Sequence, residues 1–352
     1  MPTSSCLPSL RLVRAGVFDA LNRLTVVGAV VPATGRYAVQ GAQLRAGLEL
    51  WARRARVELK LEDDKSRPAD SVRAYRRLVG GGCEFVLGPY GSDSTRAVAI
   101  AGGGSLVWNH GAAADDVQRL PGVVSVASPA SGYLVALARG VAALRPAASV
   151  ALVTGSGRFA AFARDGLERH ASGLGLAIVA RFSLRADPVD IAAVGADAVL
   201  LCGPLAGELA MLRALVTLVP RAVLGGVSPG LADFARLLDH DPEGILAPVQ
   251  WHPAVITVPE LGPASAVVLA DALARGHDEL DYVAGQAYAA ALIATRCLQE
   301  RPDDPLQAAR RLNTTTFFGA FSLDPITGLQ RGHRLSVIQW RGTKPQPLAV
   351  EP

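Results

Sequence analysis

Residues 319–342 have the sequence Gly319-Ala-Phe-Ser-Leu-Asp324-Pro-Ile-Thr-Gly328-Leu-Gln-Arg-Gly-His-Arg-Leu-Ser-Val-Ile-Gln-Trp-Arg-Gly, and this stretch decides the predicted fold. Within it, Phe321 and Leu323 alternate with polar neighbours, as in a half-buried strand. Asp324 and Gly328 then supply the residue types of a turn, and a second apolar run follows. The pattern predicts a terminal hairpin of two short strands, whereas most α/β domains end on a helix or a central strand.

Short apolar runs alternate with amphipathic stretches from residue 24 onward. The first series has expected strands at 24–31, 57–61, 85–87, 106–108 and 123–126, with helices at 41–54, 69–79 and 94–101. A helix at 133–144 leads into a second series, with strands at 150–153, 177–182, 198–201 and 222–224 and helices at 159–171, 207–216 and 231–238; residues 244–249 form a further apolar run. Helices at 264–275 and 283–299 follow. Because Val- and Leu-rich strands alternate with helices, the pattern predicts parallel sheets covered on both faces.

The two series predict an α/β fold made of two Rossmann-like doubly wound lobes joined by three crossings. The crossings are expected near 128–131, 249–253 and 319–324. The predicted division of the chain is an N-terminal extension at 1–23, lobe 1 at 24–130 plus 251–320, and lobe 2 at 131–250 plus 321–345. Two α/β lobes without a flexible tether between them predict a pair that hinges.

Residues 1–23 do not have the pattern of a secretory signal. Such a signal needs an apolar run of about 7–15 residues, but Arg11, Arg14 and Asp19 interrupt this segment. Cys6 has no apolar run before it, so it does not resemble a lipoprotein cysteine. The sequence therefore predicts a cytoplasmic protein, or an extracytoplasmic one if the natural start differs.

Composition and charge argue against several other classes of protein. The net charge is only +4, and the densest arginine cluster, Arg53, Arg54 and Arg56, has no aromatic residues interleaved with it, so we expect a solvated helix face and no nucleic-acid partner. The four cysteines are far apart and form no C-x-x-C, so no zinc site or redox pair follows from them. No metal and no cofactor are expected. No stretch approaches the ~18 apolar residues that span a membrane, so direct membrane insertion is not expected.

A serine-hydrolase alternative arises from the sequence Gly226-Val-Ser228-Pro229-Gly230. It matches the G-x-S-x-G nucleophile elbow, in which the residue after the serine donates its backbone N–H to the oxyanion. Pro229 has no N–H, and losing one oxyanion donor slows such enzymes by roughly 10²–10³. We therefore expect a helix-entry loop here.

An NADP-binding alternative arises from Gly155-Ser-Gly157-Arg-Phe-Ala160, which matches G-x-G-x-x-A between a strand and a helix. The following strand ends near Arg181, a residue that suits a 2′-phosphate, and not in the acidic residue that binds a ribose. A loop that lets a ligand approach a helix N-terminus explains the same glycines.

Five loops and the terminal hairpin together resemble a known family. The loops are Pro32-Ala-Thr-Gly-Arg-Tyr37-Ala-Val-Gln-Gly, Glu62-Asp-Asp-Lys-Ser-Arg-Pro, Gly88-Pro-Tyr90-Gly-Ser92-Asp-Ser, Trp108-Asn109-His-Gly-Ala-Ala and Ser128-Pro-Ala-Ser-Gly-Tyr133. Their order and spacing resemble the leucine/isoleucine/valine-binding branch of the type 1 periplasmic binding proteins, over roughly residues 24–342. The resemblance implies a two-lobed receptor without catalysis, with a small polar solute in the cleft. It also implies the permease subunits of an ABC transporter as partners.

The resemblance, together with the position of the loops after strands, gives a set of expected contacts. The expected ligand-binding residues are Tyr37, Tyr90, Ser92, Asn109, His110, Gly111, Ala112, Ala113 and Tyr133 from the first series, and Gly157, Arg158, Ser228 and Trp251 from the second. Asp93 is expected to cap the helix at 94–101. The loop at 225–229 contains no carboxylate to pair with a ligand ammonium, so amides and carboxylates stand beside amino acids as ligands. A cytoplasmic sensor of the aliphatic-amidase-regulator type is the alternative to a transport receptor.

Overall fold

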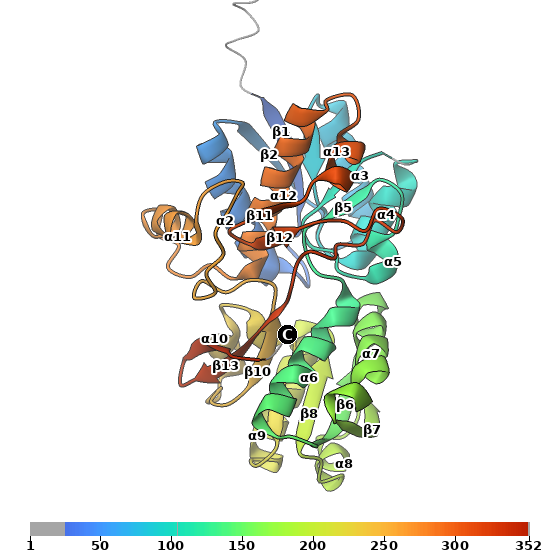
Figure 1. Ribbon diagram of the computed structural model, residues 1–352, viewed down its shortest axis with the longest axis vertical. Coiled ribbons are helices and arrows are strands. Elements are labelled where there is room, and N and C mark those ends of the chain that lie inside the picture. The colour runs from blue at the N-terminus through green and yellow to red at the C-terminus, as the bar shows by residue number, and fades with distance from the viewer. Residues whose placement is uncertain (1–24, 104, 351–352) are drawn as a thin grey trace, which may run out of the picture.

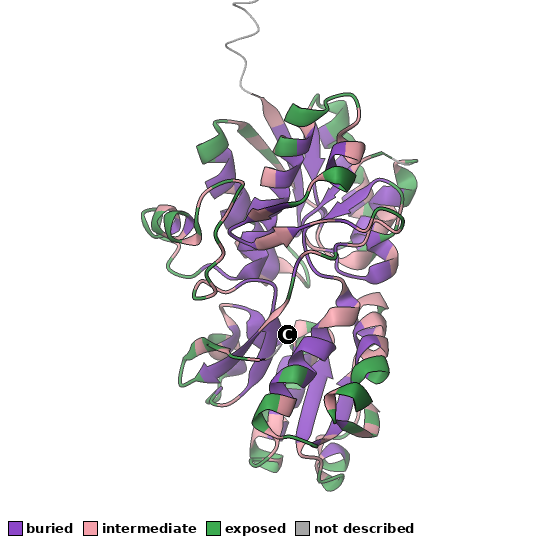
Figure 2. Cartoon of the chain, in the orientation of Figure 1, coloured by how far each residue is buried: buried purple, intermediate pink, exposed green. Residues whose placement is uncertain are grey.

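The computed structural model describes residues 25–103 and 105–350, so the predicted N-terminal extension at 1–23, including Cys6, lies outside the described residues. The chain forms two α/β lobes, drawn one above the other in Figure 1, which confirms the predicted fold class. Figure 2 shows buried strands inside both lobes and exposed residues on the outer turns of the helices. Each lobe therefore has its own sheet and its own core.

Lobe 1 is built on a five-stranded parallel sheet in the order β2-β1-β3-β4-β5. Its strands are β1 (Val26–Val31), β2 (Glu58–Asp63), β3 (Phe85–Leu87), β4 (Val107–Asn109) and β5 (Val123–Ser125). Its helices are α2 (Ala38–Ala55), α3 (Pro68–Gly80), α4 (Ser92–Ala101), α5 (Asp115–Gln118), α11 (Ser265–Leu273), α12 (Tyr282–Glu300) and α13 (Pro305–Arg311). Helices α2 and α12 pack on one face of the sheet, and α3 and α4 pack on the other.

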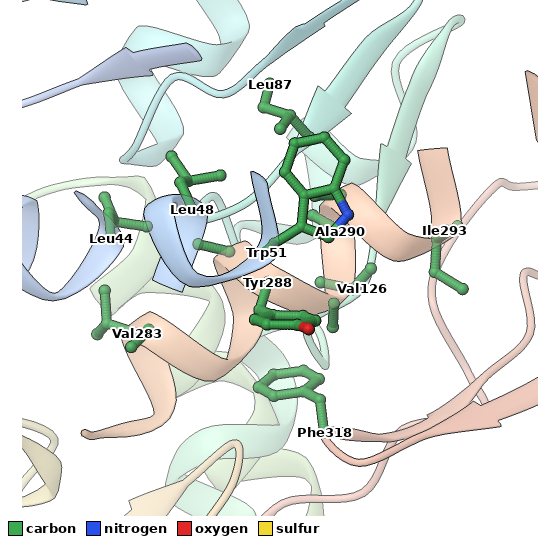
Figure 3. Close-up of a cluster of buried hydrophobic side chains, with 14 of the residues drawn as sticks. Leu44, Leu48, Trp51, Leu87, Val126, Val283, Tyr288, Ala290, Ile293 and Phe318 are labelled. Atoms are coloured by element: carbon green, nitrogen blue, oxygen red, sulfur yellow. The ribbon is translucent and has the colours of Figure 1, made fainter. Parts of the chain in front are cut away.

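The lobe 1 core shows why α2 and α12 lie so close together. Leu44, Leu48 and Trp51 of α2 are almost fully buried against α12, as Figure 3 shows. A Cβ at Gly47 would collide with the backbone of Ala284, so only glycine permits this approach. Burial of side chains of this size stabilises a core by about 1.5–3 kcal/mol each.

Lobe 2 is built on a seven-stranded mixed sheet in the order β14-β13-β10-β9-β8-β6-β7. Its strands are β6 (Ser149–Thr154), β7 (Ala177–Ser183), β8 (Ala198–Cys202), β9 (Val223–Gly225), β10 (Leu246–Val249), β13 (Ser336–Arg341) and β14 (Lys344–Leu348). Its helices are α6 (Tyr133–Leu144), α7 (Arg158–His170), α8 (Pro188–Ala193), α9 (Leu205–Leu218) and α10 (Phe234–Leu238), with short 3₁₀ turns η1 (Ala130–Gly132), η2 (Ser172–Leu174) and η3 (Ser228–Gly230). Strand β13 runs antiparallel to β10, and β14 runs antiparallel to β13, whereas the other pairs are parallel.

The predicted terminal hairpin within 319–342 is wrong. The first strand, β12 (Gly319–Phe321), pairs with β11 (Thr314–Thr316) beside lobe 1, and the second, β13, pairs with β10 and β14 in lobe 2. Asp324 does form the expected turn, since its carboxylate accepts hydrogen bonds from the backbone of Ile326 and Thr327. One isolated bridge, between Leu323 and Gln330, flanks that turn, and the chain then leaves for the second sheet.

Three crossings join the lobes, and buried side chains bind them to one another. The first two lie between β5 and α6 and after β10, near the expected positions, whereas the third begins after Gln330 and enters lobe 2 at β13. The Gln250 side chain accepts from Ser128 N at 2.9 Å, and Ser128 Oγ donates to the His333 carbonyl at 3.0 Å. His333 Nε2 donates to the Gln250 carbonyl at 2.7 Å, so all three crossings form one hydrogen-bonded hinge.

Candidate functional site

A cavity of about 170 Å³ lies between the lobes and takes its walls from both of them. Loops that follow β3 and β4 line it from lobe 1, and loops that follow β6, β8 and β9 line it from lobe 2. Nine of the expected contacts meet here: Tyr37, Tyr90, Ser92, Gly111, Ala113, Tyr133, Gly157, Arg158 and Ser228. The carboxyl ends of parallel strands thus bring together residues that are up to about 190 positions apart in the sequence.

The four other expected residues do not line this cavity. Asn109, His110 and Ala112 are at most 1% exposed and belong to the support beneath the loop after β4. Trp251 is 4% exposed and packs its ring edge-on against Phe317, with centroids 5.5 Å apart. Each of these positions lies at the end of a strand or shortly after one, but its side chain turns into the protein.

Asn109 holds the loop after β4 in place from below. Its Oδ1 accepts from Gly111 N at 3.0 Å and Ala112 N at 2.7 Å. Its Nδ2 donates to the Ala112 carbonyl at 2.7 Å and to Ser125 Oγ at 2.6 Å. The amide is fully used by the protein, so its role is to shape the cavity wall at Gly111 and Ala113.

His110 is a buried structural histidine. Its Nε2 lies 3.2 Å from the Val30 carbonyl, to which it donates. Burial lowers the pKa of His110 to about 4, so the ring is neutral at physiological pH. The side chain therefore ties the loop after β4 to β1 beneath the cavity.

Helix α4 begins directly at the cavity wall. Its N-cap is Gly91, at φ 89°, and not Asp93 as expected; Asp93 lies in the first turn. Ser92 Oγ accepts from Ala114 N at 3.2 Å, which leaves the Ser92 hydroxyl hydrogen free to donate. A Cβ at Gly111 would collide with the Tyr90 ring, so this glycine allows Tyr90 to rest on the neighbouring loop.

Glu208, a residue that the sequence did not indicate, holds the lobe 2 loops in place. Its carboxylate accepts from Gly203 N at 2.7 Å and from Ser228 N at 2.8 Å, and both of these residues line the cavity. Glu208 is fully buried, and burial raises its pKa to about 7. One side chain near the start of α9 thus positions two cleft loops.

Arg158 spans the mouth of the cavity from lobe 2 to lobe 1. Its Nη1 lies 2.6 Å from Asp116 Oδ2, and its Nε lies 3.7 Å from Asp93 Oδ1. All three side chains are partly exposed, so the pairing is screened by solvent. The contacts join lobe 2 to lobe 1.

Tyr133 links the cavity to the hinge. Its ring packs edge-on against Phe159, with centroids 4.9 Å apart, and both residues line the cavity. Its hydroxyl accepts from Gln250 Nε2 at 2.7 Å, and Gln250 also bonds Ser128 in the first crossing. A ligand in contact with Tyr133 is therefore one hydrogen bond away from the crossings.

Several lining residues were missed from the sequence. They include Arg36, Gln40, Ser156, Phe159, Leu205, Val227, Leu231, Tyr282 and Gln286. Asp281 marks the start of the helix that carries Tyr282, since it is the N-cap and accepts from Val283 N at 2.8 Å, but this signal does not place Tyr282 at a cavity. Gln40 lies in the first turn of α2, and no local pattern separates it from a surface residue.

The two enzyme motifs have structural explanations. Ser228 lies in η3 with its backbone N–H bonded to Glu208, and no hydrogen bond joins Ser228 to a histidine among the described residues. Arg181, the residue suited to a 2′-phosphate, instead pairs with Glu168 of α7 at 2.7 Å. Gly157 and Arg158 line the cavity at the entry to α7, and the approach of a ligand to this helix N-terminus stays a prediction.

The described residues contain neither a metal cluster nor a membrane-spanning helix. Within 25–103 and 105–350, no cluster of three or more His, Cys, Asp or Glu is arranged to hold a metal ion. No helix in the same ranges is both long and apolar enough to cross a membrane.

Comparisons with known proteins agree with this geometry. A family model described as periplasmic binding protein matches residues 25–342. A search of curated proteins found no significant match.

Similar solved structures include three solute receptors. The branched-chain amino acid transporter substrate-binding protein LivJ from Streptococcus pneumoniae, in complex with isoleucine, has a TM-score of 0.79 at 16% identity and covers 94% of this chain and 100% of its own. A solute-binding protein of an ABC transporter from Rhodopseudomonas palustris, in complex with p-hydroxybenzoic acid, has a TM-score of 0.77 at 19% identity and covers 94% and 98%. The leucine-binding protein LivK from Thermotoga maritima has a TM-score of 0.79 at 15% identity and covers 93% and 98%.

Proposed function

Because the chain belongs to the periplasmic binding protein family, we propose that it is a non-catalytic receptor that binds a small polar solute between its two lobes. The solute is an amino acid, an amide or a carboxylate, and the partner is the permease of an ABC transporter. The ligands named for similar structures, isoleucine and p-hydroxybenzoic acid, fall within these classes.

One observation supports this proposal above the others: the cavity has polar walls contributed by both lobes. Ser92 and Tyr90 face it from lobe 1, and Ser156 and Ser228 from lobe 2, so a bound solute bridges the lobes. Closure around such a solute excludes water and strengthens its hydrogen bonds. Tyr133 and Gln250 connect this contact to the hinge.

A thermal-shift screen with amino acids, amides and short carboxylates tests the receptor role. A specific solute at a hundredfold excess over its Kd stabilises the protein by about 2.7 kcal/mol. Titration calorimetry then compares Ser92→Ala with Ser105→Ala, because Ser105 is exposed outside this cavity and hydrogen-bonds Gly102.

Loss of the Ser92 donor is expected to cost about 1–3 kcal/mol, or roughly 5- to 150-fold in Kd. Ser105→Ala should bind as the wild type does. A screen without any binder, or equal affinities in the two variants, would count against the proposal.

A further inference from the structure

A buried glutamine in the cavity wall has an oxygen without a partner. Gln40, in the first turn of α2, lines the cavity and is 7% exposed, and its Oε1 receives no hydrogen bond from any described residue. Gln286, near the start of the neighbouring helix α12, adds a second amide to the same wall and is 2% exposed. A buried acceptor without a donor is costly, so we expect the bound solute to bring an N–H or O–H to Gln40.

The amide of a glutamine presents an acceptor and a donor side by side. Its oxygen accepts hydrogen bonds, and its nitrogen carries two hydrogens. A group that pairs with both atoms has an N–H next to a carbonyl or a ring nitrogen, which is how glutamine binds the edge of adenine. A carboxylate offers acceptors alone and would leave Gln40 Oε1 unpaired. Gln40 therefore favours a solute with adjoining donor and acceptor atoms.

The charged side chains of the cavity lie at its rim. Among the described residues that line it, Arg36, Asp93 and Arg158 are the charged ones. Arg36 is exposed and lies 4.6 Å from the centroid of the Tyr37 ring. The side chains of Asp93 and Arg158 are 53% and 38% exposed and lie 3.7 Å apart. A charged group deep in the cavity would lose its water without meeting a buried charge of opposite sign, so a neutral solute is favoured.

Neutral hydroxyls complete the polar surface of the cavity. Tyr90 and Tyr282 line it, and burial raises the pKa of both well above the ordinary value, so both keep their hydrogens. Ser92 Oγ accepts from Ala114 N and retains its own hydrogen for an acceptor. The cavity thus offers donors as well as the Gln40 acceptor, and a solute that satisfies it needs both kinds of atom.

Aromatic rings and a small volume favour a solute with a single flat ring. The rings of Tyr37 and Tyr90 meet edge-on with centroids 5.3 Å apart, and those of Tyr133 and Phe159 do so at 4.9 Å. Such rings pack well against another flat ring. The cavity has a volume of about 170 Å³, and an apolar cavity of about 150 Å³ in another protein holds one benzene molecule.

We propose that the solute is a neutral single-ring lactam, which is a flat ring with an N–H beside a carbonyl, as in a pyrimidine base such as uracil. Its N–H donates to Gln40 Oε1, and the adjoining carbonyl accepts from Gln40 Nε2. The hydroxyls of Tyr90 and Tyr282 are donors for its remaining acceptor. This inference rests on the proposed receptor function and narrows its ligand from amides in general to cyclic ones.

Titration calorimetry at neutral pH with four solutes tests the inference. Uracil has the ring, the carbonyls and the N–H groups, whereas 1,3-dimethyluracil has the same ring and carbonyls without an N–H. Acetamide has the amide without the ring, and sodium benzoate has a flat ring with a charged acceptor and no donor. We expect uracil to bind and the other solutes to bind roughly tenfold more weakly or worse, because each lacks either the donor or the ring.

Gln40→Met removes both polar atoms at nearly constant volume and should weaken uracil binding about 5- to 150-fold. It should change the binding of 1,3-dimethyluracil much less, because that solute has no N–H for the Gln40 oxygen. Gln299→Met is the control, since Gln299 is exposed on α12 outside the cavity, and it should bind uracil as the wild type does. Without solute, Gln40→Met should unfold at the wild-type temperature or above it, because the lost oxygen had no partner.

Each part of the inference has an outcome that overturns it. Equal affinities for uracil and 1,3-dimethyluracil would overturn the donor, acetamide binding as tight as that of uracil would overturn the ring, and tighter binding of benzoate would overturn the neutral class. Equal uracil affinities of Gln40→Met and Gln299→Met, or a lower unfolding temperature of Gln40→Met without solute, would overturn the role of Gln40.

The ligand class and the receptor role fail in different ways. A protein that binds another solute of the wider screen but not uracil would overturn the ligand class and leave the receptor proposal standing. Failure of every solute in that screen would overturn the receptor proposal itself.

Discussion

Asn109 in lobe 1 and Glu208 in lobe 2 perform the same structural task with different chemistry. Each is buried, and each accepts hydrogen bonds from two backbone amides of cleft loops: Gly111 and Ala112 for Asn109, and Gly203 and Ser228 for Glu208. Asn109 does not titrate, whereas burial raises the pKa of Glu208 to about 7. The support that Asn109 gives the lobe 1 wall should therefore be insensitive to pH, whereas the support that Glu208 gives the lobe 2 wall should respond to pH near neutrality.

Asn109→Ala should have the largest effect. It removes four hydrogen bonds and leaves their partners buried, which is expected to lower the free energy of unfolding by about 4 kcal/mol. Urea denaturation measures this loss. Asn313→Ala is the control, because Asn313 is exposed. A loss below about 1 kcal/mol for Asn109→Ala would show that the loop does not depend on this amide.

Glu208→Gln should change how stability depends on pH. The pKa of Glu208 rises from an ordinary 4.5 to about 7 on folding, so the folded protein holds a proton that the unfolded chain has released between these values. The stabilisation is complete below pH 4.5 and is lost as pH rises to 7, by on the order of 3 kcal/mol. Glutamine cannot titrate, so the variant lacks this decline.

Other buried groups also titrate, so the effect of Glu208 is the difference between the stability profiles of the wild type and Glu208→Gln over pH. Asp281 has a pKa raised to about 6, so it also lowers the free energy of unfolding as pH rises, and it does so equally in the wild type and in the variant. His110 and His333 have pKa values lowered to about 4. They act in the opposite direction, because the free energy of unfolding that they contribute is lost as pH falls from 6.5. Urea denaturation of wild type and variant between pH 4.5 and 8 gives the difference, and parallel profiles would contradict a titrating Glu208.

Arg158→Gln should have the smallest effect. It breaks the partly exposed pairing between the lobes, so closure around a solute loses about 0.2–1 kcal/mol, or up to about fivefold in Kd. Arg164→Gln is the matched control on α7, because Arg164 pairs with Asp165 within lobe 2. Calorimetry with the best solute from the screen should show weaker binding only for Arg158→Gln, and 1 M salt should reduce the difference. Equal affinities would mean that the pair does not stabilise closure.

The sequence predicted the lobes well because their strands and helices have strong periodic patterns. The helix at 133–144 has the predicted bounds, and the strand at 85–87 does too. The prediction of a terminal hairpin was wrong, although Asp324 and Gly328 do lie in a turn. The strand that pairs with β12 is Thr314–Thr316, which has no apolar alternation and therefore gave no strand signal. Local turn chemistry therefore located the bend but not the strand pairing.

The candidate site was predictable where loops follow strands and not where helices supply the wall. Tyr90 and Ser92 were found in this way, whereas Gln40 and Tyr282 reach the cavity through the packing of α2 against α12, a tertiary feature. Asn109 occupies an expected position, but its amide is used by the protein itself. The sequence therefore predicts which loops reach the cavity. Whether a side chain points into the cavity or into the protein is seen only from its hydrogen bonds in the structure.

Hydrogen exchange with and without the strongest-binding solute tests most directly the central claim that one ligand is held by both lobes. The account predicts slower exchange in two lobe 1 segments, 90–94 and 111–114, and in two lobe 2 segments, 156–160 and 227–228. The separate lobe 1 groove lined by Val79 and Cys83 should exchange as it does without ligand. Protection confined to a single lobe, or centred on that groove, would contradict the account.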